Sequence, residues 1–150
     1  MTTFICKKFQ ELSLKELYDI MVLRQAVFVV EQDCVYLDAD GNDHAAWHLM
    51  GFDEQQQLVA YTRLLPKGTT YEKYPAFGRV VTSPSVRGKG IGRALMEHTL
   101  NWMDKIFPAE DVKISAQCYL EKFYRSFGFE VVGEEYLEDG IPHYPMLRKA

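Results

Sequence analysis

The chain has 150 residues, of which 47% are hydrophobic and 25% are charged, and its formal net charge is −4. These values are typical of one globular domain with a sizeable core, so residues 1–150 are predicted to form a single domain. The negative net charge excludes a general nucleic-acid-binding surface. No apolar run has the length of a membrane span, and the N-terminus shows no signal-peptide core.

The three cysteines, Cys6, Cys34 and Cys118, are odd in number and far apart in the sequence. They suit neither a disulfide framework nor the spacing of metal ligands. The sequence therefore predicts no metal site, and a reducing cytoplasm is the expected location.

The N-terminal part begins with a predicted strand over residues 4–9. Ser13 and Glu16 have the spacing of a capping box, which predicts a helix from residue 14 to about residue 27. Residues 31–43 follow with five carboxylates and no basic side chain. We expect a loop or an irregular second helix there, which either attracts a cationic ligand or is a solvated face.

Strands dominate the middle of the chain. Two apolar runs, 48–52 and 58–64, are separated by a polar segment and predict a β-hairpin. Residues 66–75 are expected to form a surface excursion, and residues 77–82 a further strand. Apolar side chains at helical spacing then indicate a helix over residues 91–106, which ends before a proline.

The C-terminal part is predicted to contain a strand over residues 112–116 and a short helix over residues 120–127. Two closing strands follow, at 130–136 and 143–148. The order of strands and helices fits an α/β (α+β) domain with three layers built on one mixed sheet.

The most informative segment lies between the strand at 77–82 and the helix at 91–106. Gly88, Gly90 and Gly92 precede and open this helix and leave its first backbone N–H groups uncovered. Together with the positive end of the helix dipole, such a turn is suited to holding a phosphate. The Walker loop is excluded because its Gly-Lys-Ser/Thr ending is missing, and the glycine spacing also misses the dinucleotide fingerprint. The alternative is a plain strand-to-helix turn made tight by glycine.

Two motifs carry a family resemblance. The spacing Arg87-x-x-Gly90-x-Gly92 resembles the acyl-CoA diphosphate loop of the GNAT superfamily of N-acetyltransferases, and the Tyr-x-x-x-Gly-Phe run that starts at Tyr124 resembles the end of its final helix. Further segments along nearly the whole chain resemble the ElaA-like subgroup. The resemblance implies a GNAT-like fold, with a mostly antiparallel central sheet and helices on both faces. It also implies acetyl-CoA as co-substrate and a homodimer.

The resemblance assigns acetyl-CoA binding to particular residues. Val80, Val81 and Thr82 would lie along the pantetheine arm and the thioester, although relatives often carry an apolar residue where Thr82 stands. Gln117 would bond the arm where relatives often have asparagine. Tyr124 would be the general acid that protonates the departing thiolate, and the alternative is an aromatic anchor on an amphipathic helix. The diphosphate would be held by backbone N–H groups and basic side chains of these residues: Arg87, Gly88, Lys89, Gly90, Ile91, Gly92 and Arg93.

A further group must take a proton from the attacking amine. An amine with a pKa of about 10 is only about one part in a thousand neutral at pH 7. The candidates for this base are Glu31, His48 and His143. Glu31 follows the first helix, where the family places its acceptor site, and His143 begins the last predicted strand. Each also has an ordinary structural explanation, as a surface carboxylate or as a turn histidine.

The main functional hypothesis is direct transfer of an acetyl group from acetyl-CoA to a primary amine of a small molecule or peptide. One alternative is a covalent acyl-enzyme at Cys118. The other is a non-catalytic module that binds or senses acyl-CoA or assembles with a partner. The residues do not distinguish a polyamine, an amino acid, an antibiotic or a protein N-terminus as the acceptor.

Overall fold

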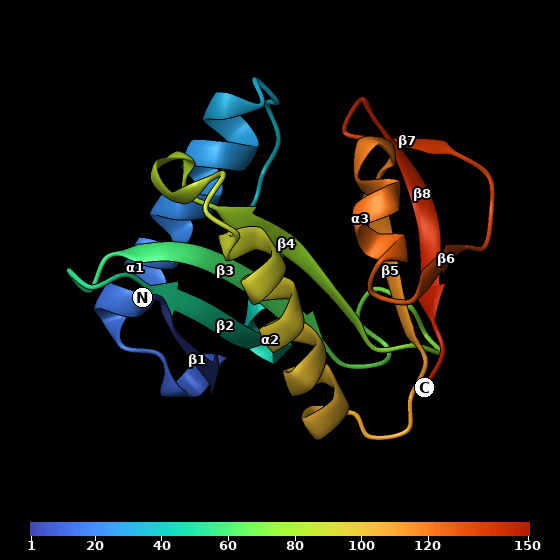
Figure 1. Cartoon of the computed structure of the whole chain (residues 1–150), viewed down its shortest axis with the longest axis horizontal. Coiled ribbons are helices and arrows are strands. Elements are labelled where there is room, and N and C mark those ends of the chain that lie inside the picture. Colours follow the sequence, from blue (N-terminus) through green and yellow to red (C-terminus); the bar gives the residue numbers. More distant parts are fainter.

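The computed structural model describes residues 1–150 and contains eight strands, three α-helices and one π-helical segment, together with short 3₁₀ turns (Figure 1). The strands are β1 (Thr3–Lys8), β2 (Trp47–Phe52), β3 (Leu58–Leu65), β4 (Ala76–Thr82), β5 (Val112–Gln117), β6 (Phe129–Val131), β7 (Tyr136–Glu138) and β8 (Ile141–Arg148). The helices are α1 (Leu14–Arg24), α2 (Ile91–Ile106) and α3 (Glu121–Arg125), and the π-helical segment is η2 (Gln25–Glu31). None of the helices combines the length and the apolarity that crossing a bilayer would need.

The strands form two sheets, and every strand pair in them is antiparallel. The first sheet has the order β1-β2-β3-β4. The second has the order β5-β8-β6, with β7 also paired to β8. The expectation of one continuous mixed sheet is therefore wrong.

The two sheets meet where β4 and β5 begin, and the strands diverge toward their other ends (Figure 1). At the meeting point the Lys113 N–H donates to the Pro75 carbonyl oxygen at 3.2 Å. Beyond it, β4 pairs only with β3 and β5 pairs only with β8. The facing edges of β4 and β5 therefore keep backbone groups that no strand satisfies.

A β-bulge in β4 gives a physical reason for this divergence. Arg63 of β3 lies opposite Gly78, whereas Tyr61 lies opposite Val81, so β4 has one residue more than β3 over this stretch. Arg79 lies within the bulge and has a left-handed φ of 53°. A bulge bends its strand and increases the local twist, which turns β4 away from β5.

The first predicted helix has the expected beginning but a different end. The Ser13 Oγ accepts the Glu16 N–H at 3.0 Å, and Glu16 Oε1 accepts the Ser13 N–H at 2.8 Å, which confirms the capping box. After Arg24 the helix widens into η2, and the N–H groups of Gln32 and Cys34 bond to carbonyls five residues earlier. Such π-helical turns are frequent at functional sites.

The predicted strand over residues 130–136 is divided into β6 and β7. The chain leaves β8 between them at Gly133, where a Cβ would lie 2.7 Å from the Pro145 Cγ. Only glycine allows the backbone to pass the proline ring this closely.

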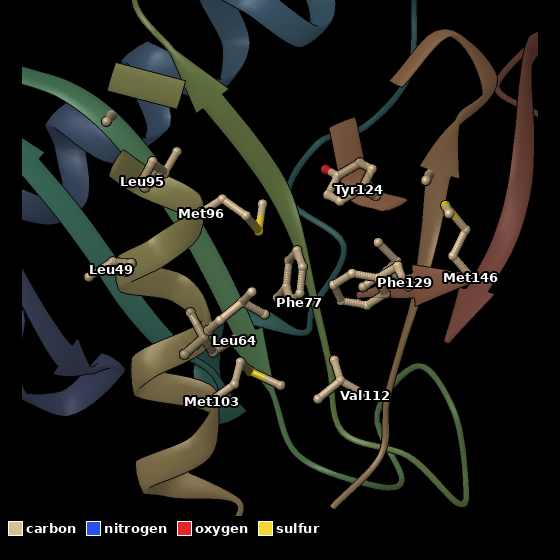
Figure 2. Close-up of a cluster of buried hydrophobic side chains, with 14 residues drawn as sticks. Leu49, Leu64, Phe77, Leu95, Met96, Met103, Val112, Tyr124, Phe129 and Met146 are labelled. Carbon is tan, nitrogen blue, oxygen red and sulfur yellow. The ribbon is translucent and has the colours of Figure 1, made fainter. Parts of the chain in front are cut away.

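Hydrophobic clusters on both faces of the first sheet define three layers. The larger cluster lies between this sheet and α2 and continues under α3 into the second sheet (Figure 2). A smaller cluster around Ile20 and Tyr61 fills the opposite face, beneath α1 and η2. Helices thus cover both faces, which confirms the predicted three-layer α/β class. The larger cluster contains Leu49, Leu64, Phe77, Leu95, Met96, Met103, Val112, Tyr124, Phe129 and Met146, among others.

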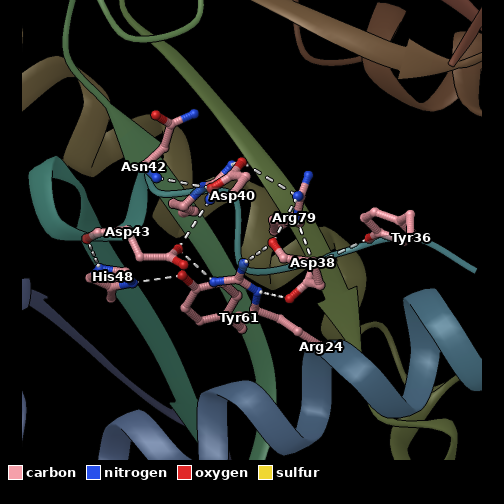
Figure 3. Close-up of polar contacts among 10 residues, drawn as sticks. Arg24, Tyr36, Asp38, Asp40, Asn42, Asp43, His48, Tyr61 and Arg79 are labelled. Atoms are coloured by element: carbon pink, nitrogen blue, oxygen red, sulfur yellow. Dashed lines mark hydrogen bonds and ion pairs between the residues drawn. The ribbon is translucent and has the colours of Figure 1, made fainter. Parts of the chain in front are cut away.

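A buried ionic cluster holds the segment between η2 and β2 on the first sheet (Figure 3). We call it the arginine–aspartate cluster. Arg24 Nε donates to Asp38 at 2.8 Å, and Arg24 Nη1 donates to Asp43 at 2.7 Å. The arginines come from α1, β3 and β4, and the aspartates come from residues 38–43. Its members are Arg24, Arg63, Arg79, Asp38, Asp40 and Asp43.

The charges in this cluster cancel, because each aspartate is shared between two arginines. Arg63 donates to Asp40 at 2.8 Å and to Asp43 at 3.0 Å, and Arg79 Nε donates to Asp38 at 2.8 Å. A charge buried without its partner is strongly unfavourable, whereas the complete set is balanced. The cluster therefore specifies where this segment lies.

We expect Asp43→Ala to lower the free energy of unfolding by about 3–5 kcal/mol, because it leaves two buried guanidinium groups without the carboxylate that they share. Urea denaturation followed by circular dichroism measures the change. The control is Lys15→Ala, which removes an exposed ion pair with Asp19 and should leave the midpoint almost unchanged. An Asp43 variant as stable as the wild type would contradict this role.

The same cluster predicts a loss of stability in acid. Burial alone would raise the pKa of Asp43, but the hydrogen bonds and charges of Arg24 and Arg63 outweigh it and lower the pKa. The pKa of Asp40 is also lowered, against its burial, mainly by Arg63. An aspartate in the unfolded chain has a pKa of about 4. The stabilisation is therefore complete above that pH and is lost as the pH falls toward the lowered pKa values of the folded protein. The urea midpoint should therefore drop below about pH 4, and Asp43→Ala should make this dependence shallower.

Candidate functional site

A cleft of about 660 Å³ occupies the space between β4 and β5 beyond the bond that joins them. Its walls come from β4, the end of β5, η2, α3 and the β7–β8 hairpin. The predicted residues that line it are Glu31, Val80, Val81, Thr82, Arg87, Gly92, Gln117, Tyr124 and His143. The remaining predicted residues, Gly88, Lys89, Gly90, Ile91 and Arg93, belong to the adjoining turn. The cleft thus brings together groups from three separate parts of the sequence.

The glycine turn, residues 87–93, lies at one end of the cleft. Six consecutive backbone N–H groups, from Gly88 to Arg93, form no hydrogen bond within the protein. Gly88 and Gly90 have left-handed φ values of 81° and 78°. A Cβ at either of them, or at Gly92, would meet no atom within 4 Å. The positive end of α2 and its N–H groups therefore face open space, which is the arrangement that binds phosphate groups.

Arg87 and Glu31, which were predicted for different roles, contact each other. Arg87 Nη1 donates to Glu31 Oε2 at 2.5 Å, and Arg87 Nη2 donates to Glu31 Oε1 at 3.0 Å. Arg87 Nη2 also donates to the Thr82 carbonyl oxygen at 3.2 Å. The hydrogen bonds from Arg87 lower the pKa of Glu31. A carboxylate held in this way is a poor proton acceptor, which counts against Glu31 as the base.

The other two basic side chains of the turn differ from each other. Arg93 Nη2 donates to Ser126 Oγ at 3.1 Å, and its guanidinium lies 4.7 Å from the centre of the Phe127 ring. Arg93 therefore joins the first turn of α2 to the end of α3. Lys89 is exposed and forms no ion pair, so its charge is available to a ligand at the turn.

The strand β4 contributes its backbone to the cleft. Val81 is buried beneath η2, whereas Val80 packs against the cluster on the other face. Their side chains thus pack into the core on opposite faces of the first sheet. The unpaired backbone edge of β4 faces the cleft. Gln117, at the end of β5, lines the cleft as well.

Tyr124 lies inside the cleft. Its side chain is 5% exposed, and its hydroxyl forms no hydrogen bond with the protein. Figure 2 shows this hydroxyl directed toward β4 across the gap between the sheets. Burial raises the pKa of Tyr124, so the phenol keeps its proton at neutral pH. It is placed to donate that proton to a bound group.

His143 lies in the cleft wall beside the β7–β8 turn. Its Nδ1 is 2.7 Å from the Ile141 carbonyl oxygen, and because a carbonyl only accepts, Nδ1 carries the proton in the neutral ring. Nε2 therefore holds the lone pair, and it lies 3.5 Å from Glu138 Oε2. The Tyr136 ring stacks on the imidazole with centroids 6.0 Å apart. His143 thus has a defined tautomer, with a carboxylate beside the nitrogen that holds the lone pair.

His48 does not belong to the site. It is completely buried beneath the arginine–aspartate cluster, and both ring nitrogens are occupied (Figure 3). Nε2 lies 2.9 Å from the Asp43 carbonyl oxygen, and Nδ1 lies 2.6 Å from the Tyr61 hydroxyl. Burial also lowers the pKa of His48. A group this inaccessible cannot take a proton from a substrate, so this expectation is wrong.

The acidic segment 31–43 is neither a solvated face nor an unpaired anionic surface. Four of its five carboxylates are paired with arginines that the sequence places elsewhere. The negative groups that line the cleft without an arginine or lysine partner are Glu138 and Asp139 instead.

Glu138 was missed as a member of the site. The Asp139-Gly140 turn has positive φ at both residues, and it pairs Glu138 with Ile141 and Tyr136 with His143. An Asp-Gly pair between two strands is a strong hairpin signal. With that register, the sequence would have placed Glu138 beside the histidine. No group of three or more His, Cys, Asp or Glu side chains is placed to hold a metal ion.

Comparison with known proteins gives the same assignment along almost the whole chain. Residues 27–150 match the acetyltransferase (GNAT) domain family. Protein ElaA of Escherichia coli is 44% identical over 141 residues, which cover 93% of this chain and 91% of that protein. Its crystal structure superposes with a TM-score of 0.92 at 40% identity, over 99% of this chain and 100% of that one.

A second crystal structure, of an acyl-CoA N-acyltransferase from Pseudomonas aeruginosa, gives a TM-score of 0.93 at 43% identity over 99% of both chains. These findings confirm the resemblance to the superfamily and to the ElaA-like subgroup. The chain belongs to the GNAT family of acetyltransferases.

Proposed function

We propose that the protein transfers an acetyl group from acetyl-CoA directly to a primary amine of a small molecule or peptide. The observation that supports this most is the run of six unpaired N–H groups at one end of a cleft with two unpaired strand edges. Acetyl-CoA carries a diphosphate, an extended arm and a thioester in that order. The glycine turn would hold the diphosphate, and the arm would extend along β4 toward Tyr124.

In the proposed reaction the amine lone pair attacks the thioester carbonyl carbon and forms the C–N bond. The carbonyl electrons move to oxygen, where a backbone N–H on the open edge of β4 would stabilise the negative charge. The C=O bond then re-forms as the C–S bond breaks with its electrons on sulfur. The leaving thiolate takes the proton of the Tyr124 hydroxyl, and the resulting tyrosinate regains a proton from the acylated nitrogen, directly or through water.

His143 is the proposed acceptor of the amine proton. Its Nε2 carries the lone pair because Nδ1 is bonded to the Ile141 carbonyl oxygen, and Glu138 lies next to it. Removing this proton matters because the neutral amine costs about 4 kcal/mol at pH 7. Glu31 is a weaker candidate, because its carboxylate is held by Arg87.

Direct transfer also agrees with the surroundings of Cys118. This residue does not line the cleft. Its Sγ lies 3.7 Å from Glu135 Oε1, and desolvation together with that carboxylate raises the pKa of the thiol. The thiolate needed for a covalent intermediate is therefore disfavoured.

The function is tested in two steps. Isothermal titration calorimetry with coenzyme A should show one binding site per chain. Thiol release from acetyl-CoA is then measured over a panel of polyamines, amino acids, aminoglycosides and peptides. Binding without turnover on any acceptor would favour the non-catalytic module, and a lack of binding would refute the assignment of the turn.

The location in the cytoplasm and the formation of a homodimer also remain predictions.

We expect Gly92→Val to weaken coenzyme A binding at least ten-fold while the protein stays folded. Gly92 is helical, without a left-handed φ, and its added Cβ meets no protein atom, so only a ligand at the turn would be obstructed. Asn101→Val, at an exposed position of the same helix, controls for the helix propensity of valine. Calorimetry gives the affinity, and thermal unfolding checks the fold. Equal affinities for Gly92→Val and the wild type would exclude the turn as the binding site.

We expect Tyr124→Phe to lower kcat about 100-fold or more with little change in KM, because the proton is needed only in the transition state. The hydroxyl has no partner in the protein, so its removal should not reduce stability. Tyr18→Phe, at an exposed site on α1, is the control. Steady-state kinetics with acetyl-CoA measure both constants. Unchanged kcat in the Tyr124 variant would remove the residue from the acid role.

A further inference from the structure

The contact between Arg87 and Glu31 links two parts of the site that the sequence separates by 56 positions. Glu31 is the last residue of η2, and Arg87 is the first residue of the glycine turn. Both side chains are roughly two-fifths exposed, and both line the cleft. The pair therefore connects η2, which forms one wall of the cleft, to the glycine turn, where the diphosphate is proposed to bind.

The pair uses the same donors that a diphosphate would use. Both terminal nitrogens of Arg87 point to the two oxygens of Glu31, in the fork that guanidinium groups also offer to phosphate. A phosphate on the neighbouring N–H groups would compete with the Glu31 carboxylate for this fork. Arg87 thus cannot give this fork to Glu31 and to a phosphate at the same time.

No other guanidinium of the turn replaces Arg87. Arg93 is engaged with Ser126 and the Phe127 ring, and Lys89 offers an ammonium without the bidentate fork. In this structure the backbone N–H groups of the turn are free to bind a phosphate, whereas the Arg87 guanidinium is bound to the Glu31 carboxylate.

Resting on the proposed function, we propose that Glu31 is a built-in competitor of the diphosphate of coenzyme A for Arg87. Binding of the diphosphate transfers Arg87 from the carboxylate to the phosphate. This exchange detaches the end of η2 from the glycine turn. Val27, Phe28 and Gln32 around this end also line the cleft. Glu31 is therefore a residue that lowers the affinity of the turn for ligands that carry a diphosphate.

The test is a double-mutant cycle on coenzyme A affinity, measured by calorimetry at low ionic strength. Glu31→Gln should tighten coenzyme A binding by two- to five-fold, which corresponds to about 0.4–1 kcal/mol, the range of an exposed ion pair. Arg87→Ala should weaken binding, and adding Glu31→Gln in that background should change nothing further. Pantetheine, which lacks the diphosphate, should bind the wild type and Glu31→Gln equally well.

Asp33→Asn is the matched control, because it removes a nearby carboxylate that has no arginine partner. An equal tightening by Asp33→Asn, or a tightening by Glu31→Gln that persists without Arg87, would show a general field effect and overturn the competition. Weaker binding by Glu31→Gln would show that Glu31 holds Arg87 ready for the phosphate, and would overturn it too. If the wild type binds no coenzyme A, the proposed function fails; if it binds and the cycle shows no coupling, only this inference fails.

Discussion

The divergence of β4 from β5 is the constraint on which the rest of the site depends. One hydrogen bond joins the two strands where they begin, and the bulge at Arg79 carries β4 away from its neighbour. Backbone groups that normally satisfy each other in a sheet are thereby left open along both walls of a cleft. The groups proposed for binding and catalysis lie around that opening. The glycine turn continues from β4, Gln117 ends β5, and His143 lies on the strand that pairs with β5.

The bulge is in turn supported by buried charge. Arg79 has a backbone conformation that costs a non-glycine residue about 1 kcal/mol or more. Its guanidinium is bound to Asp38 and to Asp40, which anchors the bulged residue to the segment after η2. That segment forms one wall of the cleft. The arginine–aspartate cluster therefore does more than stabilise the fold, because it also connects the bend of β4 to this wall of the cleft.

Local patterns in the sequence predicted much of this structure. The Ser13 capping box, the hairpin of β2 and β3, and the helix after the glycine turn all follow from residues that are close together. The features that were not predicted depend on distant partners. Asp40 is neutralised by Arg63, which is 23 positions away, and no property of the acidic segment itself reveals that arginine. The burial of His48 and the pairing of Glu31 with Arg87 are of the same kind. The division of the sheet was also missed, because a bulge depends on the register between two strands and not on composition.

The two sheets together present edges of two kinds. The outer edges are short or charged: β6 and β7 have three residues each, and β1 carries Lys7 and Lys8. The longer unpaired edges, on β4 and β5, face each other inside the molecule. Exposed, flat edges invite other chains to add a strand and aggregate, and lysines or short strands discourage this. The fold thus turns its longest unpaired strand edges toward each other and away from neighbouring molecules, while only short or charged edges face outward.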